Sequence, residues 1–275
     1  MSIITLTTDF GASDGYVGTM KGVILSIAPD AALVDITHEI APQTIRQAAY
    51  VLHAAAPYFP RGTIHLAVVD PGVGSARRAL AVRTSQGFLV GPDNGLFTLF
   101  FADEPDVECR AITNAKYRLP HVSATFHGRD VFAPVAAHLA NGADLADLGP
   151  RITDPVTFAV PLPTQQPDGS WLGCVLYADH FGNLITSVTE DLLQQLISDG
   201  RHSVEIVIGQ QCISGIRRTF AEGAPGELVA LLGSSGHLEI AVTNGNAARA
   251  LNSRLYWPPG VGPDSPVTLR KKQEA

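Results

Sequence analysis

The stretch TIHLAVVD (residues 63–70) is a near-continuous run of apolar residues that ends in an acid. Such runs are typical of strands buried on both faces of a parallel sheet. Other strand-like segments are found at 3–8 (IITLTT) and 32–37 (ALVDIT), while apolar residues recur at helical spacing at 15–29 and 44–59. This alternation predicts an N-terminal layered α/β domain with a mostly parallel sheet. Because ligands of such domains bind beyond the carboxyl ends of strands, acids that follow these strands become candidate site residues.

The sequence changes in character after a predicted helix near 130–141. Residues 154–170 contain four prolines and few helix formers, which predicts a linker. Short strands with turn signals follow, as in a small antiparallel barrel or sandwich. We therefore expect the fold class α/β, with an N-terminal domain at residues 1–153 and a smaller C-terminal all-β barrel domain at 171–275. The expected strands of the second domain lie at 172–179, 183–188, 203–209, 227–233 and 237–242.

The composition is that of a compact globular protein. Of the 275 residues, 45% are hydrophobic and 16% are charged, which excludes a disordered chain. A net charge of −7 without a basic stripe argues against a nucleic-acid partner, because contacts to phosphates need clustered Lys and Arg. The basic cluster Arg270, Lys271 and Lys272 is expected to be solvated in a C-terminal tail.

The cysteines and the N-terminus indicate the compartment. Cys109, Cys174 and Cys212 are too scattered for a zinc site and odd in number for a closed set of disulfides. Reduced, mostly buried thiols favour the cytoplasm. The sequence has neither a signal-peptide pattern at its start nor an apolar run long enough to span a membrane. We expect a soluble, untargeted protein without a membrane partner.

The motif TTDFGASDG (residues 7–15) places Asp9 at a strand end, two residues before Gly11. The two oxygens of a carboxylate can accept both hydroxyl protons of a ribose diol in charge-assisted hydrogen bonds. The alternative is a loop acid that only accepts hydrogen bonds from backbone N–H groups.

The motif DPGVGSARR (residues 70–78) resembles a phosphate-binding loop but lacks its essential parts. A dinucleotide fingerprint needs a third glycine that opens a helix, whereas Arg77 stands there and a strand follows; a P-loop needs Gly-Lys-Ser/Thr. Asp70 and either Arg77 or Arg78 could form an ion pair that only braces the turn. The same pair could act in a site, because a fixed cation favours negative charge that develops nearby.

The motif TFHGRDVFAPVAAHLA (residues 125–140) places His127 in a loop before a helix that Asp130 could cap. A histidine at this position is either structural or catalytic. His127, Asp130 and His138 do not form a known metal signature, so we expect no metal site. The sequence has no Gly-x-Ser-x-Gly motif, so a serine hydrolase is not supported.

The motif ADHFGNLITS (residues 178–187) begins the second domain's candidate site. Asp179 and Asn183 flank Phe181, an arrangement of two hydrogen-bonding side chains around an aromatic face that suits an adenine-like or amino-acid ligand. The alternative is a β-turn that uses Gly182 and Asn183. The later segment GSSGHLEIAVTNGNAA (233–248) adds backbone donors and Asn244.

In this order the motifs resemble one family along nearly the whole chain, the S-adenosyl-L-methionine hydroxide adenosyltransferases. These are adenosine-forming hydrolases related to the fluorinase and chlorinase, which attack the same substrate with halide. The resemblance implies an N-terminal α/β domain, a C-terminal β-barrel, and a homotrimer with ligand sites at subunit interfaces. The matching segments are TTDFGASDGYVGTMKG, VVDPGVGSARRA, GPDNGLF, TFHGRD, DHFGN and GSSGHLEIAV.

The resemblance also implies roles for individual residues. The family's Asp-Arg-His set corresponds to Asp70, Arg77 and His127, with Arg78 as the alternative arginine. The ribose-binding acid corresponds to Asp9. The block for the amino-acid end of methionine corresponds to Asp179 and Asn183 around Phe181, and Ser234 falls in the equivalent C-terminal contact loop.

Two departures from the halogenases favour water as the nucleophile. The fluorinase resembles this chain but has a Tyr at the position of Asp70, where an acid would repel halide. It also has an insertion near residues 83–91, which are too few here to hold it. A Trp in the second helix block of the fluorinase aligns near Gln43 of this chain. The side of the substrate site that this Trp forms in the fluorinase must therefore be formed by other residues here.

The resemblance thus implies hydrolysis of S-adenosyl-L-methionine to adenosine and L-methionine, without a metal or any other cofactor. Arg77 would stabilise hydroxide-like charge, while Asp70 and His127 would orient the water and share its proton. The sequence leaves open which of the two takes the proton. Two alternatives are a halide-dependent adenosyl transferase and a non-catalytic nucleoside-binding module.

Overall fold

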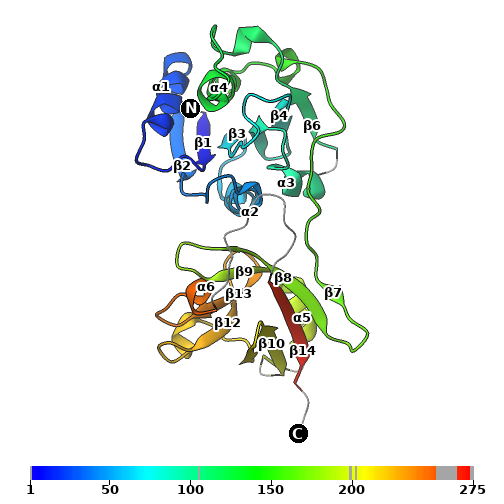
Figure 1. The fold of residues 1–275 in the computed structure, drawn as a ribbon. Coiled ribbons are helices and arrows are strands. Elements are labelled where there is room, and N and C mark those ends of the chain that lie inside the picture. Colours follow the sequence, from blue (N-terminus) through cyan, green and yellow to red (C-terminus); the bar gives the residue numbers. More distant parts are fainter. Residues whose placement is uncertain (1, 105, 198–199, 202, 252–264, 273–275) are drawn as a thin grey trace. The chain divides into compact units, whose positions relative to one another are not determined.

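The computed structural model describes residues 2–272 except 105, 198–199, 202 and 252–264. The chain divides into two compact units, residues 1–159 and 160–275. Figure 1 shows the secondary structure of each unit. The division falls inside the proline-rich segment. Residues 154–158 of this segment form hydrogen bonds with the rest of the first unit, and β7 (Thr164–Gln165) pairs with a strand of the second.

The first unit is built on a six-stranded sheet with the order β2-β1-β3-β5-β4-β6. Strands β2, β1, β3 and β5 are parallel, whereas β4 runs antiparallel to both of its neighbours. All six residues of β3 are buried, as the apolar run predicts. The mostly parallel sheet of an α/β domain is therefore confirmed. Its strands are β1 (Ile3–Thr8), β2 (Ala32–Thr37), β3 (Thr63–Val68), β4 (Ala79–Arg83), β5 (Gly87–Pro92) and β6 (Glu108–Ala111).

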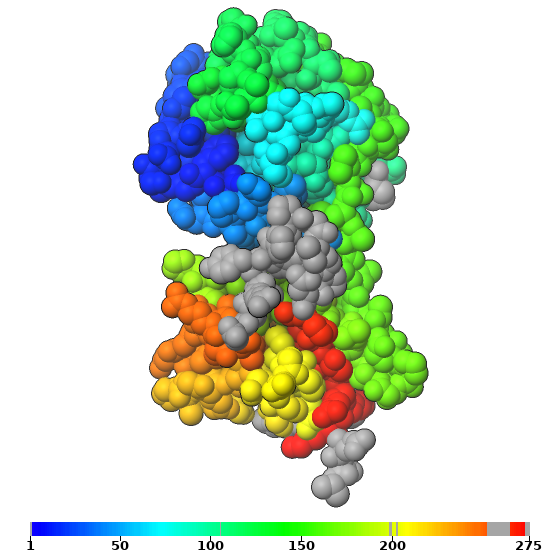
Figure 2. Space-filling view, in the orientation of Figure 1, coloured from blue at the N-terminus to red at the C-terminus, as the bar shows by residue number. Residues whose placement is uncertain are grey.

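Helices cover the two faces of this sheet. Leu66 and Val68 of β3 pack in the core that contains α1 and α4, while Ala67 and the following Val69 pack in the core that contains α2. Because a core lies on each side of the sheet, neither face of β3 is exposed to solvent. The surfaces of the α1 and α4 regions (blue and green in Figure 2) adjoin each other. The helices are α1 (Tyr16–Ile27), α2 (Ile45–Ala55), α3 (Thr98–Asp103) and α4 (Ala133–Ala140), with short helical turns η1 (Ala56–Tyr58), η2 (Ala115–Tyr117), η3 (Gly128–Phe132) and η4 (Leu145–Leu148).

The second unit contains an antiparallel sheet with the order β11-β10-β14-β8-β9-β13-β12, and β7 pairs with β8. A bridge between Arg217 and Leu231 links the two ends of this order, so the sheet is a nearly closed barrel. The expected all-β barrel is confirmed. Its further elements are β8 (Trp171–Ala178), β9 (Leu184–Thr189), β10 (Val204–Ile208), β11 (Gln211–Ser214), β12 (Leu228–Leu232), β13 (His237–Val242), β14 (Pro266–Lys271), α5 (Glu190–Leu196), η5 (Phe220–Glu222) and α6 (Ala247–Ala250).

The structure corrects two expectations, one about the C-terminal basic cluster and one about the cysteines. Arg270 and Lys271 belong to strand β14 and not to a tail, and Arg270 pairs with Glu205 of β10 at 3.0 Å. Cys109 and Cys174 are buried, as expected, but Cys212 is exposed. Burial raises the pKa of Cys109 to about 12, so its thiol stays protonated and unreactive.

Candidate functional site

Asp9 and Asp70 emerge at the same edge of the first sheet. Strands β1 and β3 are parallel neighbours in which Thr8 is paired with Val68, so the residues that follow them come out side by side. Burial raises the pKa of Asp9, and the nearby charge of Asp70 raises it further. The sheet therefore brings together two acids that lie far apart in the sequence.

A tight turn returns the chain from Asp70 to Arg77. The turn is closed by hydrogen bonds from Val73 N to the Asp70 carbonyl and from Ser75 N to the Gly72 carbonyl. It needs glycine at residue 74, where φ is 76° and an added Cβ would lie 2.3 Å from the Ala124 carbonyl oxygen. Arg77 Nε then donates to Asp70 Oδ1 at 2.9 Å and Arg77 Nη2 to Oδ2 at 2.5 Å.

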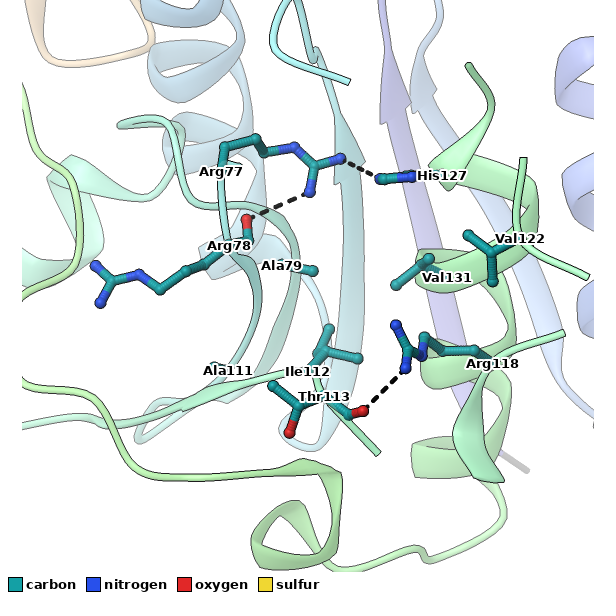
Figure 3. Close-up of a pocket in the computed structure, with 10 residues that line it drawn as sticks. All are labelled: Arg77, Arg78, Ala79, Ala111, Ile112, Thr113, Arg118, Val122, His127 and Val131. Atoms are coloured by element: carbon teal, nitrogen blue, oxygen red, sulfur yellow. Dashed lines mark hydrogen bonds between the residues drawn. The ribbon is translucent and has the colours of Figure 1, made fainter. Parts of the chain in front are cut away.

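His127 completes this group from a distant segment. Arg77 Nη2 and His127 Nδ1 are 2.7 Å apart (Figure 3). Because a guanidinium can only donate, Nδ1 must accept, and the neutral ring then carries its proton on Nε2. Burial lowers the pKa of His127, and the positive charge of Arg77 lowers it further. The side chains of Asp70 and Arg77 are only 5% and 10% exposed, so this network is largely shielded from solvent.

The structure distinguishes the two neighbouring arginines. Arg78 points away from Asp70 and pairs with Asp93 at 2.6 Å and with Asp154 at 2.7 Å. Arg77 is therefore the arginine that joins the predicted acid and histidine.

Asp9 has a backbone partner. Its Oδ2 accepts a hydrogen bond from Gln43 N at 2.8 Å, and Gln43 adopts φ = 66°, a left-handed conformation that is uncommon for residues other than glycine. Asp9 thus accepts a hydrogen bond from a backbone N–H group, as the alternative structural interpretation of this residue predicts. Since a carboxylate has about four lone-pair positions, this bond leaves acceptor capacity for a ligand.

Asp130 does not cap the helix, contrary to expectation. The capping position is taken by His127, and η3 is a single π-helical turn, a feature that is frequent at functional sites. Asp130 is fully buried, and its carboxylate accepts from Ser123 N at 2.8 Å and from Arg129 Nε at 2.5 Å. Asp130 therefore fastens the loop that carries His127.

An aromatic cluster beside these residues was not predicted. The rings of Phe10, Tyr16 and Phe126 contact one another, with centroids 5.2 to 5.9 Å apart. Tyr16 is 51% exposed, so the cluster offers an accessible aromatic surface. Its sequence signal was the position of Phe10 directly after Asp9 and of Phe126 directly before His127.

In the second unit, residues 179–183 form a closed turn. Asp179 accepts from Asn183 N at 2.8 Å and from Asn183 Nδ2 at 3.0 Å, and Gly182 has φ = 84°. The β-turn alternative is thus correct as a description of the backbone. The turn leaves the ring of Phe181 72% exposed, while Asn183 is buried.

Glu239 of β13 is a buried acid that was not singled out from the sequence. Burial raises its pKa, and the charge of Asp179 raises it further. Burial, Glu239 and Asp179 together raise the pKa of Tyr177 to about 12. Within the described part of the chain, no cation forms an ion pair with Glu239. This region therefore favours a positively charged ligand group. The available signal was an acid inside the apolar run HLEIAV.

Ser234 and Asn244 are both exposed and lie in turns. Asn244 has φ = 53° in the turn after β13. Asn246, not Asn244, lies against the 179–183 turn, because a Cβ on Gly182 would collide with the Asn246 amide. Asn246 also caps α6 by accepting from Arg249 N at 2.8 Å.

The described residues contain no group of three or more His, Cys, Asp or Glu that could hold a metal ion. None of the helices in the described ranges is both long enough and apolar enough to cross a membrane.

A buried acid–arginine–histidine network beyond parallel strands, joined in one chain to a small β-barrel, is the architecture of an enzyme that acts on a small molecule. Residues 4–149 match the family model described as SAM hydroxide adenosyltransferase N-terminal domain, and residues 173–256 match the corresponding C-terminal domain. The chain belongs to the SAM hydroxide adenosyltransferase family. The resemblance drawn from the motifs is thereby confirmed.

Individual relatives agree with this assignment. A protein of Salinispora tropica named (R)-S-adenosyl-L-methionine hydrolase is 42% identical over 250 residues, which are 90% of this chain and 93% of the relative. A solved structure of an uncharacterized conserved protein from Thermotoga maritima has a TM-score of 0.86 and 35% identity, covering 97% of this chain and 100% of that one. A fluorinase of Actinoplanes sp. is more distant, at 28% identity over 87% of this chain and 90% of its own.

Proposed function

We propose that this protein hydrolyses (R)-S-adenosyl-L-methionine to adenosine and L-methionine. The observation that carries the proposal is the shielded network of Asp70, Arg77 and His127 beside Asp9. Residues 4–149 and 173–256 of the same chain match the two family models.

The reaction is a displacement at the ribose C5′ atom. The oxygen of water forms a bond to C5′ while the C5′–S bond breaks. The electron pair of the C5′–S bond goes to the sulfur. L-methionine leaves as a neutral thioether, so the leaving group needs neither a general acid nor a Lewis acid. The difficulty lies in the nucleophile, because neutral water is a weak nucleophile and a very weak acid. Since the leaving group needs no Lewis acid, we propose a reaction without a metal or other cofactor.

The geometry favours Asp70 as the group that takes the proton of water. Nδ1 of His127 accepts from Arg77 and Nε2 carries the ring proton, so the neutral imidazole has no free lone pair. Asp70 retains acceptor capacity beyond its bonds to Arg77. In this arrangement Arg77 stabilises negative charge on the attacking oxygen, and His127 helps to orient the water. Holding water in line with the C5′–S bond contributes up to several kcal/mol.

The remaining residues are proposed to hold the substrate. Asp9 would accept hydrogen bonds from the ribose hydroxyls, and the cluster of Phe10, Tyr16 and Phe126 offers a surface on which a base can stack. Asp179 and Asn183, with the exposed ring of Phe181, would bind the amino-acid end, together with Ser234 and Asn244. Glu239 adds a carboxylate for the α-ammonium group.

We also propose a homotrimer with the ligand sites at subunit interfaces and a cytoplasmic location. The family resemblance supports the trimer. The free thiols of Cys109 and Cys212 support a reducing compartment.

Asp70 also argues against the halide-dependent alternative, because a carboxylate beside the nucleophile would repel halide. The decisive experiment is chromatography of the products of S-adenosyl-L-methionine in ¹⁸O-water. The expected result is adenosine that carries the label in its 5′-hydroxyl. Release of only a halogenated nucleoside in the presence of halide would overturn the proposal, and so would bound nucleoside without turnover.

A further inference from the structure

The first unit contains a pocket of about 300 Å³ that adjoins the proposed catalytic network but is separate from its acids. Arg77 and His127 line one side of it, whereas neither Asp9 nor Asp70 does (Figure 3). The opposite side is formed by the end of β6 and the chain around Arg118. The proposed hydrolysis assigns no role to Arg118, Ile112 or Val122, which line the rest of this space.

The polar lining of the pocket is strongly basic. Three of its lining residues are arginines and none is an acid, although the guanidinium of Arg78 points away from the pocket in Figure 3. Two of these arginines are neutralised from outside the pocket, since Arg77 pairs with Asp70 and Arg78 with Asp93 and Asp154.

Arg118 differs from the other two arginines. Its Nη2 donates to the Thr113 carbonyl at 2.9 Å, but its buried Nε has no hydrogen-bond partner in the described part of the chain. No carboxylate among the described residues forms an ion pair with it. Figure 3 shows this guanidinium directed toward Ile112 and Thr113, below the Arg77–His127 pair. Arg118 therefore contributes a positive charge to the pocket that no acid of the described residues neutralises.

We propose that the pocket binds a small oxyanion, a carboxylate or a phosphate-like group, through Arg118. The planar guanidinium of Arg118 can present two N–H donors to two oxygens of such a group. Ile112, Val122 and Val131 give the pocket apolar walls, which strengthen the attraction between the anion and Arg118. The volume far exceeds the roughly 30 Å³ that one water molecule occupies, so a polyatomic anion fits.

Calorimetric titration with inorganic phosphate and, separately, with sodium acetate tests this site at constant ionic strength. We expect saturable binding of at least one of these anions at one site per chain. Arg118→Gln should weaken the binding at least about tenfold, as expected when a charge-assisted hydrogen bond is lost. Arg61→Gln is the matched control, because it removes one exposed arginine from the same unit and should leave the affinity unchanged.

A second variant keeps the test decisive if Arg118→Gln does not fold. Val122→Glu retains Arg118 and places a competing carboxylate at the pocket wall, so it should also abolish binding of the probe. The proposal is overturned if neither anion binds saturably, or if binding persists unchanged in Arg118→Gln or Val122→Glu. The titration contains no S-adenosyl-L-methionine, so its outcome is independent of the proposed hydrolysis.

Discussion

His65 lies in the middle of the central strand β3, and its replacement should change how the first unit responds to acid. The side chain is 4% exposed, and its Nδ1 lies 2.8 Å from Thr5 Oγ1 on β1. Burial lowers the pKa of His65 to about 4, because the protonated ring cannot be solvated between the strands. The folded protein therefore keeps this histidine neutral at pH values where the unfolded chain binds a proton.

The sign and size of the effect follow from linkage. An unfolded histidine has a pKa of about 6.5, so the unfolded chain binds the extra proton as the pH falls below that value. The contribution of neutral His65 is complete above about pH 6.5 and is lost progressively down to about pH 4. At about 1.4 kcal/mol per pH unit, the free energy of unfolding falls by roughly 2 kcal/mol at pH 5. The decrease reaches about 3 kcal/mol once His65 is protonated in both the folded and the unfolded protein.

Urea unfolding followed by far-UV circular dichroism at pH 8 and pH 5 measures this loss. Both tryptophans, residues 171 and 257, follow residue 159, so their emission is a poor reporter of the first unit. His65→Gln retains a polar group for Thr5 but cannot titrate, so it should lose about 2 kcal/mol less free energy of unfolding than wild type between these pH values. Thr5→Val is the control. It removes the hydrogen bond but not the burial, and should therefore retain the acid response of wild type. An equal loss in His65→Gln and wild type would refute the reasoning.

Other substitutions test the site itself. Arg77→Lys keeps the charge but loses the bidentate hydrogen bond to Asp70, so kcat in a product-release assay should fall by about 10²-fold or more. Arg78→Lys is the control and should alter kcat far less. Gly74→Ala forces a side chain into φ = 76° and against a carbonyl oxygen, so it should lower the melting temperature, with a cost of at least about 1 kcal/mol. Glu239→Gln should raise the KM for S-adenosyl-L-methionine about tenfold with little change in kcat; an unchanged KM would contradict its role toward the ammonium group.

The sequence allowed the first unit to be predicted well because its signals are local and repeated. The apolar run at 63–70 and the helical spacing at 15–29 correspond to β3 and α1. Antiparallel β4 could be read as a strand, but its insertion between β5 and β6 depends on long-range pairing that no local pattern encodes. Strand β14 was hidden for a similar reason, because its basic end resembled a solvated tail.

The residues of the candidate site could be predicted from the sequence more readily than the contacts between them. Nothing in the pair of adjacent arginines indicates which one turns toward Asp70; that depends on the turn at Gly74 and on Asp93 and Asp154, which hold Arg78. Glu239 was missed because its significance depends on burial and on the neighbouring charge of Asp179, and neither is visible along the strand.

The two interpretations of the 70–78 turn, a structural ion pair and a site for developing negative charge, prove to be compatible. The hydrogen bonds from Arg77 to Asp70 close the turn, and the same guanidinium also donates to His127. That second bond occupies the lone pair on Nδ1, so His127 can act as a base only if it leaves Arg77. A catalytic cycle in which His127 took the proton would therefore have to break the network in every turnover. If Asp70 takes the proton, the bond between Arg77 and His127 can persist, and the turn that orders the site remains intact during the reaction.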